Sequence, residues 1–178
     1  MVKPKNCRPA VGALRFPLWS EFIPEGQGMD LVRQIHTGDP YPLKCLACFG
    51  VNNRMYPDSP TFLQAFEKLD FVMATDIFMT DVCRYADIVL PVSTSYERSE
   101  VKCYGDRLVN YTRPAIPPVH NNRDDVSIMA ELSKRMHLND ELLEAGYEEG
   151  VRFILQESGI EDWEKEGCSP AEIGRAHV

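Results

Sequence analysis

A threonine and a carboxylate stand at a junction near the middle of the sequence. Thr75 and Asp76 directly follow an apolar run of strand length, residues 71–74, and a second apolar run, residues 88–90, ends at Pro91. A carboxylate at such a junction can accept two parallel hydrogen bonds, from two ribose hydroxyls or from the ring N–H and the exocyclic amine of guanine. The sequence leaves a second interpretation open, in which Asp76 only caps the turn that follows it.

A second junction of the same kind lies earlier in the chain. The continuous apolar run 43–51 contains Gly50 and is followed by Asn52. Glycine lets a ligand approach the backbone, and an asparagine amide both donates and accepts hydrogen bonds. Ligands of open parallel sheets bind beyond the carboxyl ends of the strands, so both junctions are candidate parts of a binding edge.

The elements that would position these junctions alternate between strands and helices. Residues 43–51 predict a strand buried on both faces, and residues 59–70 predict a helix capped by Ser59 or Thr61. Three further elements are expected: a strand at 71–75, one or two helical turns at 79–86 and a strand at 87–91. This alternation predicts an α/β fold with a parallel sheet and right-handed crossovers. Asp87 begins the last strand, away from the ligand edge, so we expect it to anchor a turn.

The segment that precedes these elements is irregular. Residues 1–42 are rich in proline and glycine. We expect this segment to pack on the domain through Phe16, Trp19 and Phe22, with a short amphipathic helix at 29–37.

The segment that follows Pro91 is mostly polar. It predicts a small β excursion, a hairpin around Gly105, and then a helix that begins near Asp124 or Asp125 with carboxylates in its first turn. Residues 138–166 predict short acidic helices.

The bulk composition excludes several classes of protein. The chain is 44% hydrophobic and 26% charged, with a formal net charge of −8 and a pI of about 5.0. An acidic chain argues against a nucleic-acid partner and against direct contact with an anionic membrane. No apolar run approaches the roughly 18 residues of a membrane span, and the N-terminus lacks the apolar core of a signal peptide.

The cysteines, histidines and scattered carboxylates predict neither a metal site nor a catalytic residue. Six cysteines are irregularly spaced, which argues against a disulfide framework. Cys45 and Cys48 form a C-x-x-C within a strand-like run, and we expect two packed thiols rather than a zinc or redox site. The remaining candidates are expected at the surface: His36, His120, His137, Asp81, Glu97 and Glu100.

Three segments together resemble one protein family. They are LKCLACFGVNN at 43–53, FVMATDIFMTDVCRYADIVLPVSTSYER at 71–98 and NNRDDVSIMAELSKRM at 121–136. Over residues 12–137 the chain resembles the Rossmann-like third domain of the large catalytic subunit of molybdopterin oxidoreductases, the dimethyl-sulfoxide-reductase family. The chain departs from the family pattern in two loops, with Asn52-Asn53 in place of Asn-Pro and ERSEVKCYGD in place of Glu-x-Glu-Gly.

The resemblance implies a partial Rossmann-like domain that holds one nucleotide of a bis-molybdopterin guanine dinucleotide (bis-MGD) cofactor with molybdenum or tungsten. It implies that Thr75 and Asp76 meet the guanosine and that Asn52 lies on the nucleotide side of its strand end. Arg98 would approach a phosphate or a base edge, and Asp125 would accept from the guanine. The full set of implied cofactor-binding residues is Gly50, Asn52, Thr75, Asp76, Thr80, Arg98 and Asp125.

The family's metal ligand lies in another domain, so the resemblance implies no catalytic residue and no metal ligand here. Many members of the family also carry an N-terminal iron–sulfur motif. Cys7, Cys45 and Cys48 do not have its spacing, so the resemblance places any iron–sulfur cluster in an N-terminal part of the subunit outside this chain. We expect a fragment of a longer oxidoreductase subunit, inactive alone. Its expected partners are the rest of that subunit, an iron–sulfur electron-transfer subunit and a membrane anchor. The compartment, cytoplasm or periplasm, stays open.

The expected organisation has four parts. Residues 1–42 are expected to form a linker segment, 43–137 the nucleotide-binding region and 138–172 a helical extension. Residues 173–178 (IGRAHV) resemble a translated sequencing adapter and are expected to be a non-native tail, with a natural disordered tail as the alternative. Two alternatives remain: a free-standing nucleotide-binding module without redox activity, and a purely structural α/β domain. The chain has no glycine-rich phosphate-loop motif, which argues against the first alternative.

Overall fold

The computed structural model describes residues 8–23, 25–104, 108–156 and 168–169. The chain divides into two compact units, an N-terminal unit of residues 1–90 and a C-terminal unit of residues 91–178. The predicted boundaries at residues 42 and 137 stay predictions.

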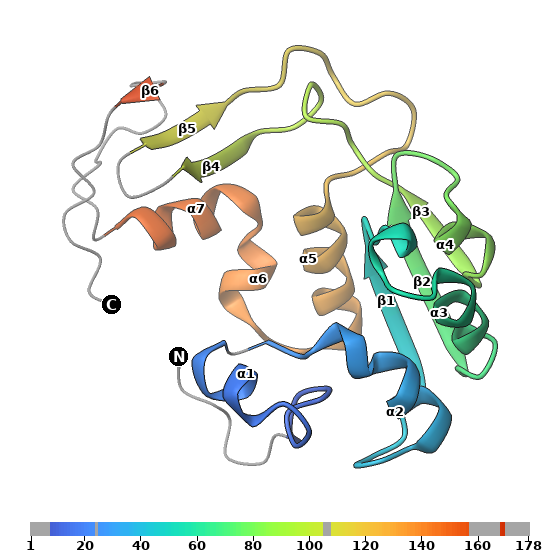
Figure 1. Ribbon diagram of the computed structural model, residues 1–178. Coiled ribbons are helices and arrows are strands. Elements are labelled where there is room, and N and C mark those ends of the chain that lie inside the picture. Colours follow the sequence, from blue (N-terminus) through green and yellow to red (C-terminus); the bar gives the residue numbers. More distant parts are fainter. Residues whose placement is uncertain (1–7, 24, 105–107, 157–167, 170–178) are drawn as a thin grey trace. The chain divides into compact units, whose positions relative to one another are not determined.

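A three-stranded parallel sheet forms the centre of the N-terminal unit (Figure 1). Its strands are β1 (Cys45–Phe49), β2 (Phe71–Asp76) and β3 (Ile88–Pro91), in the order β1-β2-β3. In the parallel register of β1 and β2, Phe49 lies opposite Thr75. The predicted α/β fold with a parallel sheet is confirmed, and Asp87 anchors its turn as expected, because it accepts a hydrogen bond of 2.7 Å from the amide of Val72.

Short helices accompany the sheet. They are α1 (Pro17–Phe22), η1 (Gly28–Asp30), α2 (Leu31–Thr37), η2 (Asn53–Met55), α3 (Ser59–Phe66) and α4 (Asp81–Arg84). The predicted cap of α3 is wrong. Asp58 caps this helix, with a left-handed φ of 52°, and its side chain accepts from the amide of Thr61.

The core of the N-terminal unit lies between α3 and the sheet. Phe62 stacks on Tyr56 with ring centroids 4.1 Å apart and meets Phe66 edge-on at 5.0 Å. The buried cluster comprises Cys48, Phe62, Leu63, Phe66, Val72, Ala74, Val82 and Cys83. These contacts fix α3 against β1 and β2 and so position the ends of both strands.

Two expectations about burial in this unit are wrong. In β1, Cys48 is buried but Cys45 and Ala47 are exposed, so the strand is covered on one face instead of two and its two thiols are not both packed. In the N-terminal segment, Phe22 is 77% exposed, and Phe16 and Trp19 are also at the surface. The six-residue helix α1 has no buried residue.

The C-terminal unit begins with an antiparallel hairpin, β4 (Glu100–Tyr104) and β5 (Leu108–Thr112), as predicted. A two-residue strand, β6 (Cys168–Ser169), pairs with β5. Helix α5 (Asp125–Met136) begins at the predicted place, because Asp124 caps it by accepting from the amide of Ser127 at 2.8 Å.

The two helices that follow α5 are short and acidic in their first turns, as expected. They are α6 (Glu141–Ala145) and α7 (Tyr147–Leu155). The rest of the predicted helical extension, the expected non-native tail 173–178 and the turn at Gly105 lie outside the described residues. None of the described helices is both long and apolar enough to span a membrane.

Candidate functional site

The carboxyl ends of β1 and β2 form one edge of the sheet in the N-terminal unit. Gly50 follows β1 with a φ of +57°, and its amide donates to the carbonyl of Thr75 at 3.0 Å. A Cβ atom added at position 50 would meet no atom within 4 Å, so the space next to this backbone is open. The positive φ, rather than crowding, is the reason for glycine here.

Asn52 and Asn53 follow and have different surroundings. The exposed Asn52 caps η2, because its Oδ1 accepts from the amide of Arg54 at 3.1 Å. Its Nδ2 forms no hydrogen bond with the described part of the chain. The buried Asn53 donates to the hydroxyl of Ser59 at 2.7 Å, which ties the loop to the start of α3. Asn52 is therefore the member of the pair that can still bind a ligand.

Asp76 ends β2 and is half-buried. Its Oδ1 accepts from the amide of Phe78 at 3.1 Å, so it does cap the turn that follows. Its Oδ2 receives one long hydrogen bond, 3.5 Å from the hydroxyl of Thr80. A carboxylate offers about four acceptor positions, so capping the turn leaves capacity for a ligand. The two interpretations of Asp76 therefore do not exclude each other.

Two threonines hold this edge in place. Thr75 is 1% exposed, and its carbonyl accepts the hydrogen bond from the amide of Gly50. This buried residue therefore links the ends of β1 and β2. Thr80 caps α4 by accepting from the amide of Cys83 at 3.5 Å. The loop between Asp76 and Thr80 brings three exposed apolar side chains to the same edge, which the sequence analysis did not single out: Ile77, Phe78 and Met79.

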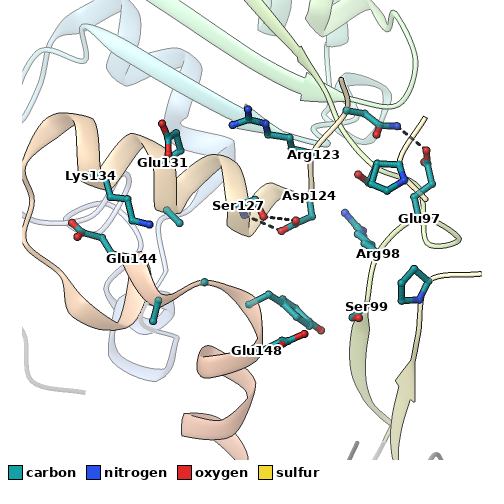
Figure 2. Close-up of a pocket in the computed structure, with 18 residues that line it drawn as sticks. Glu97, Arg98, Ser99, Arg123, Asp124, Ser127, Glu131, Lys134, Glu144 and Glu148 are labelled. Carbon is teal, nitrogen blue, oxygen red and sulfur yellow. Dashed lines mark hydrogen bonds between the residues drawn. The ribbon is translucent and has the colours of Figure 1, made fainter. Parts of the chain in front are cut away.

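Arg98 and Asp125 lie in the C-terminal unit and form an ion pair, with 3.3 Å between Nη1 and Oδ2. Arg98 also donates through Nε to Glu100 at 2.9 Å. Two cavities of about 620 and 260 Å³ share Arg98, Ser99, Asp124 and Tyr147 in their walls. Figure 2 shows Arg98 directed into the larger cavity. Five of the seven predicted residues thus lie in the N-terminal unit and two in the C-terminal unit.

Glu97 was expected as an exposed loop carboxylate, and that expectation is wrong. It is 6% exposed. Its Oε2 accepts from the amide and hydroxyl of Thr94 at 2.7 and 2.8 Å. Its Oε1 accepts from the amide of Val119 at 2.6 Å. It also accepts from Nδ2 of Asn122 at 2.8 Å, the hydrogen bond drawn at Glu97 in Figure 2. The spacing Thr94-x-x-Glu97 resembles that of a capping box, and this sequence signal could have indicated the contacts with Thr94 but not those with Val119 and Asn122.

These hydrogen bonds, of which the one from Asn122 acts most strongly, lower the pKa of Glu97 to about 2. A carboxyl group whose pKa is lower in the folded state stabilises that state above its ordinary pKa of 4.5 and loses this contribution as the pH falls toward 2. The free energy of unfolding of the wild-type chain should therefore fall in this range, and less so in Glu97→Gln. Denaturant unfolding at a series of pH values measures this difference, with the exposed Glu148→Gln as control. Parallel wild-type and Glu97→Gln curves would contradict it.

The remaining polar candidates show no further site. Glu100 is also wrongly expected as exposed, because it is largely buried and pairs with Arg98 and Lys102. Asp81 stays near the surface beside Arg54. The three described histidines are exposed, as expected. Among the residues that the structure describes, no three His, Cys, Asp or Glu side chains gather as a metal site requires.

Comparison with known proteins shows the family. A model of the molybdopterin oxidoreductase family matches residues 31–135, more than half of the chain. The chain therefore belongs to the molybdopterin oxidoreductase family, and the resemblance to its dimethyl-sulfoxide-reductase group is confirmed.

The relatives are much longer than this chain. A dimethyl sulfoxide/trimethylamine N-oxide reductase of Cereibacter sphaeroides is 32% identical over 112 residues, which cover 61% of this chain and 14% of the relative. A trimethylamine-N-oxide reductase of Haemophilus influenzae is 35% identical over 92 residues, 50% of this chain and 11% of the relative. The structure of acetylene hydratase from Pelobacter acetylenicus aligns with a TM-score of 0.57 at 27% identity, over 67% of this chain and 18% of that one.

Proposed function

We propose that the chain is part of the catalytic subunit of a molybdopterin-dependent oxidoreductase and forms part of the pocket for a guanine nucleotide of its bis-MGD cofactor. Family membership supports the oxidoreductase class. One observation carries the nucleotide assignment: β1 and β2 end side by side, with Gly50, Asn52 and Asp76 at one edge. A parallel sheet binds its ligands at this edge.

The chemistry of these residues fits a guanine nucleoside. Asp76 can accept from the ring N–H and the exocyclic amine of guanine, or from two ribose hydroxyls, while it still caps its turn. The Nδ2 of Asn52 can donate to the ligand. The open backbone at Gly50 lets the ligand come close. The bound cofactor would hold the metal and supply the redox chemistry on a small substrate, while these side chains orient its nucleotide end.

The other predicted residues have supporting or additional roles in this proposal. Thr75 and Thr80 hold Asp76 and the strand end in position. Arg98 and Asp125 are proposed as further contacts to a phosphate or base of the cofactor. The partners of the chain are the remainder of the same subunit, an iron–sulfur subunit that exchanges electrons with it, and a membrane anchor.

Replacing Asp76 with asparagine tests the nucleotide assignment. Asparagine keeps an acceptor for the turn but loses the charged acceptor pair. Because a hydrogen bond to a charged group contributes about 1.5–3 kcal/mol, the cofactor should leave about tenfold faster or more. The measurement is the rate at which the purified full-length protein that contains residues 1–172 loses guanine nucleotide, determined as GMP after pyrophosphate cleavage.

The matched control is Asp70→Asn, an exposed carboxylate that precedes β2 at the opposite end of the same strand. Its nucleotide release should equal that of the wild type. An unchanged release rate in Asp76→Asn would refute the assignment. If the chain binds GMP and the full-length protein contains no pterin, the free-standing nucleotide-binding module is correct instead.

A further inference from the structure

Two segments of the C-terminal unit run beside each other and lead to Arg98 and Asp125. The first segment is residues 92–98 and the second is residues 119–125. Val92 and Arg123 form a parallel bridge, and the amide of Ser93 donates to the carbonyl of Arg123 at 3.0 Å. The position of each segment therefore depends on the contacts that hold it to the other segment.

Glu97 is the side chain that joins these segments. One carboxylate oxygen binds Thr94 within the first segment, and the other binds Val119 and Asn122 in the second. The amide of Glu97 donates to the carbonyl of Thr94 at 3.0 Å, so backbone and side chain close the same turn. All four of the hydrogen bonds that the carboxylate accepts are made in a buried position, where they are hardest to replace by water.

The residues next to this junction are the two predicted cofactor contacts of the unit. Arg98 directly follows Glu97, and Asp125 lies three positions after Asn122. Their ion pair of 3.3 Å spans the same two segments. Figure 2 shows Glu97 beside Arg98, with Arg98 directed into the cavity. A shift of either segment would move the guanidinium.

We propose that Glu97 is a positioning residue for the cofactor site, acting through Arg98 by locking segments 92–98 and 119–125 together. This inference rests on the proposed function, because it needs Arg98 to contact the cofactor. Glutamine cannot replace the carboxylate, since its NH₂ group would face either the two donors of Thr94 or those of Val119 and Asn122. The low pKa of Glu97, about 2, agrees with a charge that stays in place at neutral pH.

The experiment is a double-mutant cycle on the purified full-length, cofactor-loaded protein that contains residues 1–172. The variants are Glu97→Gln, Arg98→Gln and the combination of both, with guanine-nucleotide release as the readout. We expect about tenfold faster release in each single variant and no further increase in the double variant, because both remove the same contact. Hydrogen exchange should also become faster for the amides of Thr94 and Val119 in Glu97→Gln.

The possible outcomes separate the two proposals. If Asp76→Asn releases nucleotide at the wild-type rate, the proposed function fails. If Asp76→Asn accelerates release but Arg98→Gln or Glu97→Gln does not, only the role of Glu97 is wrong. Effects that multiply in the double variant would show that Glu97 acts on general stability and not through Arg98, which also overturns the inference. A variant that does not fold is replaced by Asn122→Ala, which removes one of the four donors and should give a smaller increase of the same kind.

Discussion

Replacing Phe62 with alanine is expected to lower the free energy of unfolding of the N-terminal unit by about 3–5 kcal/mol. Phe62 is 2% exposed and contacts two other aromatic rings, Tyr56 and Phe66. Its removal loses the transfer free energy of the ring and leaves a cavity between α3 and the sheet. The measurement is denaturant unfolding of the chain, with hydrogen exchange to locate the change within residues 1–90.

The control for this prediction is Phe22→Ala, the same substitution at a side chain that is 77% exposed. It should change the stability by less than about 0.5 kcal/mol, because little apolar area leaves a buried environment. The exchange of the Gly50 amide, which bonds to Thr75 across the strand ends, should accelerate in Phe62→Ala and stay unchanged in Phe22→Ala. Equal effects of the two substitutions would mean that α3 does not support the sheet.

The strands and most helices could be predicted because their signals are local. The apolar run at 71–75 became β2 (Phe71–Asp76), and the carboxylates near residue 124 marked the start of α5. The cap of α3 could not be predicted in this way. Asp58 adopts a positive φ, which is uncommon for residues other than glycine, and Ser59 offered a conventional alternative one position later.

Burial was harder to predict, because it depends on elements that a local pattern does not contain. The run 43–51 is apolar on both faces, but only the face of Leu46 and Cys48 is covered, and Cys45 is exposed. The aromatic residues of α1 were also expected to be buried, but none of them is. An apolar sequence shows which side chains of a segment can be buried, but whether they are buried depends on the elements that pack against the segment.

The position of the candidate binding edge could be predicted from the ends of the expected strands, but the hydrogen bonds of its side chains could not. Thr75 and Asp76 were located by the end of an apolar run, whereas the burial of Thr75 depends on the neighbouring strand. Glu97 shows the limit most clearly. Its Thr94 contacts lie within a local motif, but Val119 and Asn122 are 22 and 25 residues away. Only the fold brings these partners together.

Replacing Asp30 with alanine is the second large effect that we expect, a loss of about 2 kcal/mol in the N-terminal unit. Asp30 is 1% exposed and holds Arg33 through two hydrogen bonds of 2.8 Å, one to each carboxylate oxygen. It also accepts from Arg15, which joins the irregular N-terminal segment to the start of α2. This loss of stability is smaller than when a fully buried ion pair loses one partner, because the guanidinium groups of Arg15 and Arg33 can both reach water.

Asp39 provides a matched control, because it pairs with the same Arg33 at 3.2 Å but is 76% exposed in its side chain. Asp39→Ala should therefore lower the free energy of unfolding by less than about 1 kcal/mol.

The hydrogen bonds from Arg33, more than those from Arg15, lower the pKa of Asp30 below its ordinary value of 3.8. The stabilisation by Asp30 is thus complete at neutral pH and is lost as the pH falls below that value, so the unfolding free energies of wild type and Asp30→Ala should converge in acid. A difference that stays constant down to low pH would mean that Asp30 stabilises the segment by packing and not by its charge.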